Sequence, residues 1–353
     1  MEVTIVPETF TVWAGGDAHV GTDLTRGDRH SLKEVILQAE KGGSEGGPSF
    51  EWDIMIDIGD TSGSQTPPDD EEGEEVVRQY GASTAHPRED FYNIVGNHDA
   101  SGPEEACQWW FRKWIDPTGE HTPHSGVDAA RRPYAVEGTW ERYKFEAGNI
   151  VFLLMGDRND GGPPVGRGSV GGFPAGAVTG ETFEWWCDEV LANRDRIIVT
   201  AHHHMLKGTT VASLDWLGVD EGYHGRFDDG APIGASYLYW VDGEPDSGRF
   251  ETFLADHYSA VDLWLGGHTH THPDDTTGGM SHIERRWGTT FVNCAAISMH
   301  HGRKNVSMTR LLTFAEGQET VNIKCYLHMS DYAEQGWYAP AERDAPLKTA
   351  YRG

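Results

Sequence analysis

The sequence predicts an α/β protein in which a parallel sheet is followed by a second sheet. Over roughly the first hundred residues, short apolar runs alternate with segments of helical period, in the order strand, helix, strand, helix, strand. This alternation is typical of a parallel sheet whose strands are connected by helices. Beyond residue 281, several apolar runs follow one another without a helical segment between them. These later runs imply a second sheet.

The first part of the chain contains three predicted strands and two predicted helices. Residues 9–15 alternate, are rich in aromatic side chains and end at a pair of glycines, so we predict a strand there. Residues 31–41 place apolar side chains at helical spacing, so we predict a helix there. A second predicted strand, 52–58, also ends in glycine, and the acidic run 69–75 leads into the next helix. The third predicted strand, 91–95, is followed by a glycine and then by an amide, an imidazole and a carboxylate.

The rest of the chain adds more helices and strands. A Trp-rich helix is predicted over 104–114, with its indoles in the core, and a hairpin over 142–145 and 149–155. Further helices are predicted at 182–191 and 249–255, each followed by a strand. The remaining predicted strands are residues 196–200, 261–265, 283–287, 290–293, 307–314 and 321–327.

We expect a single domain over residues 1–329, followed by a C-terminal tail, 330–353, that has no clear period. Two insert loops, 156–176 and 207–247, interrupt the domain, and the 44 glycines of the chain favour such loops. Long loops in a compact domain are usually functional or mobile, so we expect substrate choice to lie in these segments and in a polar loop, 21–30, that is predicted after the first strand. The sequence shows no internal repeat and no interdomain linker.

Composition excludes several classes of function. The 353 residues carry a net charge of −28 at pH 7, and a field of that sign repels nucleic acid and anionic membrane surfaces. The 4 cysteines are far apart and form no CxxC pair, which favours free thiols in a reducing compartment. The N-terminus lacks the features of a signal peptide, and no apolar run reaches the roughly 18 residues of a membrane span. We therefore expect a cytoplasmic protein.

Side chains of metal-binding type follow five of the predicted strands. Ligands gather at the carboxyl ends of the strands in α/β sheets, so we expect these side chains to meet at one edge. Imidazoles and carboxylates suit Zn, Mn or Fe. The set is too large for one tetrahedral site but suits two ions that share a bridging carboxylate. The candidates are Asp17, His19, Asp60, Asn97, His202, His268 and His270.

These residues belong to motifs that occur in a recognisable order. The motifs are Asp17-x-His19, Gly59-Asp60, Gly96-Asn97-His98-Asp99, a histidine at a strand end, and Gly267-His268-x-His270. In order and spacing they resemble the calcineurin-like metallophosphoesterase family, over residues 17 to 270. The resemblance implies a four-layer α/β/β/α sandwich of two mixed sheets flanked by helices. It also implies two metal ions, either Mn, Fe or Zn.

The resemblance implies a role for each motif residue. Asp60 would bridge the two ions, and a metal-bound hydroxide would attack phosphorus. His98 would lie beside the leaving group, with Asp99 orienting it. His203 or His204 could ligate in place of His202. The remaining ligands would be Asp17, His19 and His270 for one ion, and Asn97, His202 and His268 for the other.

The expected activity is hydrolysis of a phosphodiester or phosphomonoester of a small molecule. The Asp-x-His and Gly-His-x-His motifs are more similar to the cyclic-nucleotide and glycerophosphodiester phosphodiesterase branch than to the protein phosphatases. The tyrosine ligand of purple acid phosphatases is absent, since Thr61 to Ser64 follow Asp60. A nuclease of the same family is an alternative that the net charge disfavours. A catalytically inactive binding scaffold is another, disfavoured because every ligand position is filled.

Polar side chains in the loops near these motifs are candidates for substrate contacts. The alternative to a substrate contact is a solvated loop for Arg26 and Arg29, and a turn for Arg158. His300 and His301, close to the last strands, are further possible contacts. The candidates are Arg26, Arg29, Arg158, His203 and His224.

Overall fold

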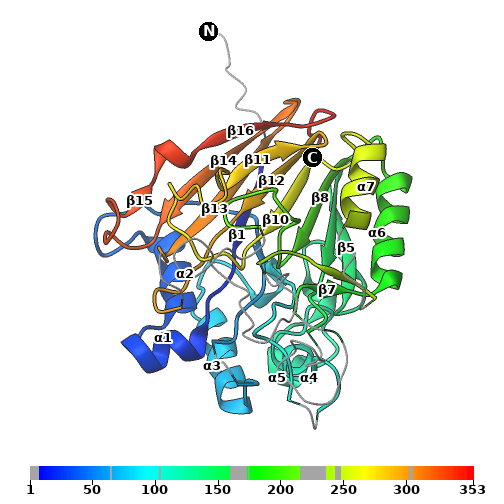
Figure 1. The fold of residues 1–353 in the computed structure, drawn as a ribbon. Helices are drawn as coiled ribbons and strands as arrows, with labels where there is room; N and C mark the ends of the chain where they lie inside the picture. Colours follow the sequence, from blue (N-terminus) through cyan, green and yellow to red (C-terminus); the bar gives the residue numbers. More distant parts are fainter. Residues whose placement is uncertain are drawn as a thin grey trace.

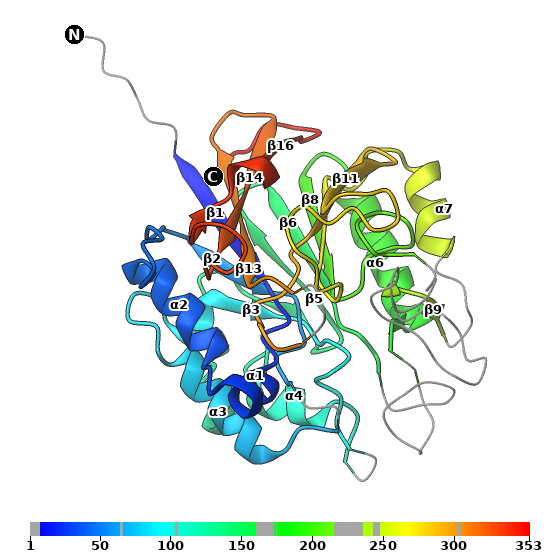
Figure 2. The same cartoon turned by 60° about the vertical axis from the view of Figure 1, so that its left-hand side comes forward.

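The chain folds into an α/β/β/α sandwich (Figure 1). Two 7-stranded mixed sheets pack face to face, and helices cover their outer faces (Figure 2). The fold class predicted from the sequence is therefore confirmed. This computed structural model describes residues 8–63, 66–102, 105–159, 173, 175–214, 236–242, 248–301 and 305–353.

The first sheet joins the N-terminal strands to the C-terminal ones. Its N-terminal strands β1, β2 and β3 run parallel, β13 pairs antiparallel with β1, and each later strand pairs antiparallel with its neighbour. In spatial order the strands are β15 (Gly336–Trp337), β14 (Thr320–Leu327), β13 (Met308–Ala315), β1 (Thr9–Gly15), β2 (Ile54–Asp57) and β3 (Phe91–Asn93), with β16 (Arg343–Pro346) also paired to β14. Residues 330–353, which show no period in the sequence, thus contribute two strands to this sheet.

The second sheet has a parallel centre and antiparallel edges. Its strands, in spatial order, are β11 (Ile283–Arg286), β12 (Thr289–Asn293), β10 (Leu263–Gly266), β8 (Ile197–His202), β6 (Ile150–Met155), β5 (Arg142–Ala147) and β4 (Glu137–Gly138). A small parallel pair, β7 (Ala177–Val178) and β9 (Trp240–Val241), lies apart from both sheets.

Helices form the two outer layers. The first sheet is covered by α1 (Val20–Gly27), α2 (Ser31–Lys41), α3 (Asp70–Tyr80) and α4 (Trp109–Trp114), and the second by α6 (Gly180–Ala192) and α7 (Gly248–Asp256) (Figure 2). The short helices are α5 (Thr122–Ser125), η1 (Arg88–Asp90), η2 (Ala129–Arg131) and η4 (Ala339–Ala341). None of the helices in the described ranges is long and apolar enough to cross a membrane.

The buried apolar side chains form four clusters, and strand alternation separates the cluster between the two sheets from those on their outer faces. Successive side chains of a strand point to opposite faces of the sheet. In β8, Val199 lies in the cluster between the two sheets, whereas Ile198 lies in the outer cluster beneath α6 and α7. Both faces of this strand are therefore buried, which is typical of a central parallel strand.

Two local expectations differ from the observed elements. The predicted loop after the first strand is mostly helical, because α1 begins at Val20. The Trp-rich helix is shorter than predicted and begins at Trp109. Its indoles at Trp110 and Trp114 are buried, as expected. Only parts of the insert loops 156–176 and 207–247 lie within the described residues.

Candidate metal centre

Residues that follow five strands of the two sheets converge in one buried group, which we call the metal-type group. The side chains of Asp17, His19, Asp60, His203 and His270 are at most 1% exposed. The backbone that presents them is unusual, since Asp17, His19 and Asp60 all have positive φ, of 53°, 43° and 54°. His268 has a φ of 66°. Non-glycine residues held in this region cluster at functional sites.

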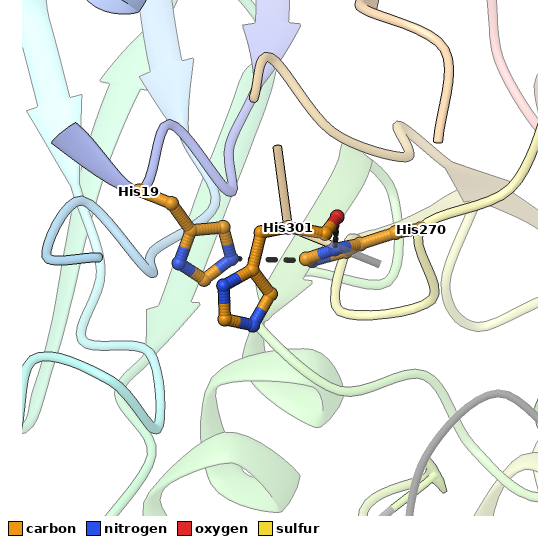
Figure 3. Close-up of side chains that lie close together, drawn as sticks. All are labelled: His19, His270 and His301. Atoms are coloured by element: carbon orange, nitrogen blue, oxygen red, sulfur yellow. Dashed lines mark hydrogen bonds between the residues drawn. The ribbon is translucent and has the colours of Figure 1, made fainter. Parts of the chain in front are cut away.

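The first subgroup lies around Asp17, and Figure 3 shows the three histidines His19, His270 and His301 of this subgroup. Asp17 Oδ1 is 2.8 Å from His270 Nε2, and His270 Nε2 is 3.2 Å from His19 Nε2. The ring of His301 stacks on that of His19, with 3.9 Å between centroids. His301 also lies close enough to His19 and His270 for one nitrogen of each to reach a shared ion.

The second subgroup lies around His203. Its Nε2 is 3.1 Å from Asp60 Oδ2 and 3.1 Å from Asn97 Oδ1. Asp60 Oδ2 is also 3.9 Å from His19 Nε2, so this carboxylate lies between the two subgroups. His268 borders the second subgroup, with its ring 5.2 Å from that of His203.

Three imidazoles present the same nitrogen to the group. The Nδ1 atoms of His19, His203 and His270 lie 3.0, 2.8 and 2.7 Å from the backbone oxygens of Ser62, Ile58 and His301. A carbonyl oxygen only accepts, so each Nδ1 carries a proton and donates it, and Nε2 is the nitrogen that faces the group. Metal-binding histidines are oriented in this way.

The buried carboxylates require positive charge beside them. Burial would raise the pKa of Asp17, but His203 and His270 hold it well below its ordinary value. Burial would lower the pKa of His203, but Asp60 and Asp17 raise it to about 10. The donor set of imidazoles, carboxylates and one amide oxygen therefore fits divalent Zn, Mn or Fe.

His98 lies at the edge of the group. Its Nε2 is 4.0 Å from Asp60 Oδ2, and its ring is 4.8 Å from that of His19. The backbone N–H of His98 donates to Asp60 Oδ1 over 2.6 Å. At 7% exposure, its ring is buried but close to the surface.

Asp99 does not orient His98, and this expectation is corrected. Its carboxylate accepts three backbone N–H groups, from Asp60 (3.0 Å), Ser62 (2.9 Å) and Gly96 (2.8 Å). These hydrogen bonds connect the loop after β2 with the loop after β3. Asp99 is therefore a positioning residue for Asp60.

His202 does not join the group, and His203 takes the place predicted for it. Since Ile198 lies in the outer cluster beneath α6, alternation directs His202 to that same face. There Nδ1 of His202 lies 3.0 Å from both the backbone nitrogen and the backbone oxygen of His204. Burial lowers the pKa of His202 to about 3. His203 shares the alternation of Val199, so its side chain points to the space between the two sheets.

The residues predicted as substrate contacts lie in different surroundings. Arg29 is buried and serves the fold, since it donates to Asp23, Glu34, Ser307 and the backbone of Ile297. Arg158 pairs with Glu141 at 2.9 Å. Arg26 is exposed and donates to His300 O. His203 lies in the metal-type group, and His224 lies outside the described residues.

Gly96 allows the loops after β2 and β3 to meet backbone to backbone. A Cβ at this position would lie 2.1 Å from Asp60 N and 2.2 Å from Asp60 Oδ1. We expect Gly96→Ala to lower the free energy of unfolding by about 1–3 kcal/mol through overpacking, and to weaken metal binding. Urea denaturation and metal titration measure the two effects. Gly81→Ala, where the nearest atom would be 3.4 Å away, is the matched control, and equal behaviour of both variants would contradict this prediction.

Comparisons with known proteins give the following results. No family model matches the chain, and no curated protein matches it. Among solved structures, it is similar to a conserved uncharacterized protein, a predicted phosphoesterase, from Streptococcus pneumoniae TIGR4, with 10% identity, coverage of 96% of this chain and 98% of that one, and a TM-score of 0.37. It is also similar to Chaetomium thermophilum Vps29, with 11% identity, coverage of 98% and 97%, and a TM-score of 0.33.

Proposed function

We propose that this chain is a metal-dependent phosphoesterase with two metal ions, of the calcineurin-like kind that its motifs resemble. The observation that carries the proposal is the orientation of His19, His203 and His270. Each is held by a backbone carbonyl at Nδ1 and turns Nε2 towards Asp17 or Asp60. A merely structural cluster has no need to turn three Nε2 atoms towards buried carboxylates.

Two ions are favoured over one by the position of Asp60. On one side of it, Asp17, His19 and His270 would hold the first ion. On the other side, Asn97, His203 and His268 would hold the second. Asp60 Oδ2 reaches towards both groups, at 3.9 Å from His19 Nε2 and 3.1 Å from His203 Nε2. Two ions in such an arrangement lower the pKa of bound water and neutralise phosphoryl charge.

The chain's own residues then position and protonate the substrate. His98, at the edge of the group, is placed to donate a proton to the leaving oxygen. His301 stacks on the ring of His19, with 3.9 Å between centroids, and meets the ring of His98 edge to face, with 4.8 Å between centroids. It is placed to contact a phosphoryl oxygen. Asp99 keeps Asp60 in place through the backbone.

The substrate we propose is a small phosphodiester or phosphomonoester. Nucleic acid is disfavoured as a substrate because the chain carries a net charge of −28, which opposes binding of a polyanion. Competition by single-stranded or duplex DNA at moderate salt tests this choice. Strong inhibition by DNA would favour the nuclease alternative.

Metal removal should abolish activity reversibly. We expect the purified protein to contain up to two bound ions per chain, and to hydrolyse bis(p-nitrophenyl) phosphate or p-nitrophenyl phosphate with added Mn²⁺. Chelation should remove the activity and lower the Tm, because a ligand that binds only the folded state stabilises it. Metal analysis and a thermal scan before and after chelation provide the measurement. A protein without bound metal and without turnover in any of Mn²⁺, Fe²⁺ or Zn²⁺ would refute the proposal.

A further inference from the structure

A second feature of the molecule, apart from the metal-type group, is a buried arginine without a counter-charge. Arg310, on β13, is 0% exposed. It donates to the backbone oxygens of Asn293 and Ala341, each over 3.4 Å. Among the described residues, it forms no ion pair, and its Nη2 has no hydrogen-bond partner. A buried charge is costly unless it is paired.

Arg310 lines a cavity of about 160 Å³. Arg310, His282 and Ala341 are buried in its wall, whereas Arg343, Thr276 and Pro340 are exposed and lie at its mouth. A cavity of about this size is large enough for a benzene-sized molecule or for several waters. The arginine whose Nη2 has no partner therefore borders a space that a ligand can fill.

The acidic residues of the cavity are bound to other groups. Asp274 Oδ2 accepts the hydroxyls of Tyr332, over 2.7 Å, and Tyr338. Asp275 Oδ1 accepts both the backbone N–H and the hydroxyl of Thr277, over 2.8 and 2.7 Å. Neither carboxylate forms an ion pair with Arg310 in the described part of the chain. Burial, and then the charge of Arg310, hold the pKa of His282 well below its ordinary value, so this wall adds no positive charge.

We propose that this cavity binds a small oxyanion, either a carboxylate or a phosphate, with Arg310 as the main charged contact. A guanidinium offers planar donors that match the oxygens of both groups. Arg343 adds positive charge at the mouth, where an incoming anion would meet it first. The ligand would satisfy the nitrogen that the protein leaves without a partner.

The cavity lies behind the loop that carries His270, but it is a separate site. His282 lies in the cavity wall, and its Nε2 is 2.7 Å from Oγ1 of Thr271. Thr271 is the residue after His270. Arg310 is absent from the metal-type group and contacts none of its members among the described residues. Binding in the cavity therefore does not depend on the proposed phosphoesterase activity.

Thermal unfolding of the metal-loaded protein with added phosphate or acetate tests this site. We expect a saturable rise in Tm with at least one of the two anions, up to about 50 mM and beyond the effect of chloride at equal ionic strength. The anion that gives the larger shift identifies the preferred class. No shift beyond that of chloride with either anion would overturn the proposal.

Variants assign the effect to the cavity. Arg310→Met should abolish the anion-dependent shift, and it should fold without the anion, since apolar replacement of a buried charge is often neutral or stabilising. Arg343→Gln should weaken the apparent affinity about two- to fivefold, as loss of an exposed charge contact does. Arg131→Gln, on an exposed arginine outside the cavity, is the matched control. Should Arg310→Met not fold, an unchanged affinity in Arg343→Gln would overturn the proposal.

Phosphate bound at the metal centre must be distinguished from phosphate bound in the cavity. The shift should persist in an Asp60→Asn background, because Asp60 does not line the cavity. A shift that vanishes in Asp60→Asn and persists in Arg310→Met would place the anion at the metal centre and overturn the proposal. That outcome would leave the proposed phosphoesterase function intact.

Discussion

Asp60→Asn should lower phosphoester hydrolysis by about a thousandfold or more and reduce the number of bound metal ions. The factor corresponds to about 4 kcal/mol, within the several kcal/mol that a metal ion contributes to charge stabilisation. Asp60 is the carboxylate whose one oxygen faces both His19 and His203. An amide keeps the shape of the side chain but removes the negative charge that would hold two cations together. Metal analysis and steady-state kinetics measure the two losses.

Asp262→Asn is the control for this variant. Asp262 is also a buried aspartate, at 3% exposure, but it accepts the backbone N–H of Ile198 and pairs with Lys348 at 3.3 Å. Its replacement should lower stability while the metal content and kcat remain close to those of the original chain. Full metal content and an unchanged rate in Asp60→Asn would refute the bridging role.

The fold and most of the candidate site could be predicted because the signals are local. Each ligand candidate directly follows a strand, and strands of an α/β sheet point their carboxyl ends to one edge. The predictions for Asp17, His19, Asp60, Asn97 and His270 needed only the order of strands and glycines. Their convergence in the structure follows from topology, with no need for precise strand boundaries.

The choice between His202 and His203 needed information that the sequence does not contain. A shift of one residue moves a side chain to the opposite face of a sheet. Residues 197–202 are buried on both faces, so no alternation of polar and apolar residues marks the inward parity. Pairing with β6 and β10 fixes that parity, and both pairings are long-range.

Long-range pairing also explains the residues whose roles were mistaken or unassigned. Arg29 reaches Ile297 and Ser307, which β1 and β13 bring near it through their antiparallel pairing. His301 reaches His19 by the same route. Asp99 is a different case, because its three backbone partners are loop N–H groups. A sequence motif shows side-chain types but does not show where loop amides point.

His203→Asn and His202→Asn should give opposite results, although the two residues are adjacent and both fully buried. His203→Asn removes the nitrogen that lies 3.1 Å from both Asp60 Oδ2 and Asn97 Oδ1. We expect it to lose one metal ion and about a hundredfold or more in kcat/KM, since even a residue behind a metal ligand is worth about 10- to 100-fold. Metal analysis at increasing Mn²⁺, with kinetics at each concentration, separates weakened binding from a lost step.

His202→Asn should instead change stability and leave the chemistry within a few-fold of the original. Its ring fills a buried position beneath α6, where Nδ1 is bonded to the backbone of His204, so its loss should cost about 0.5–3 kcal/mol of unfolding free energy. The sign of its pH dependence follows from the lowered pKa of about 3. A buried neutral histidine contributes stability that is present above the ordinary pKa of about 6.5 and is lost as the pH falls towards 3. His202→Asn should therefore reduce the acid sensitivity of unfolding over that interval. Loss of metal in His202→Asn, with metal retained in His203→Asn, would show that His202 is the ligand. It would also show that His202, and not His203, points to the space between the sheets.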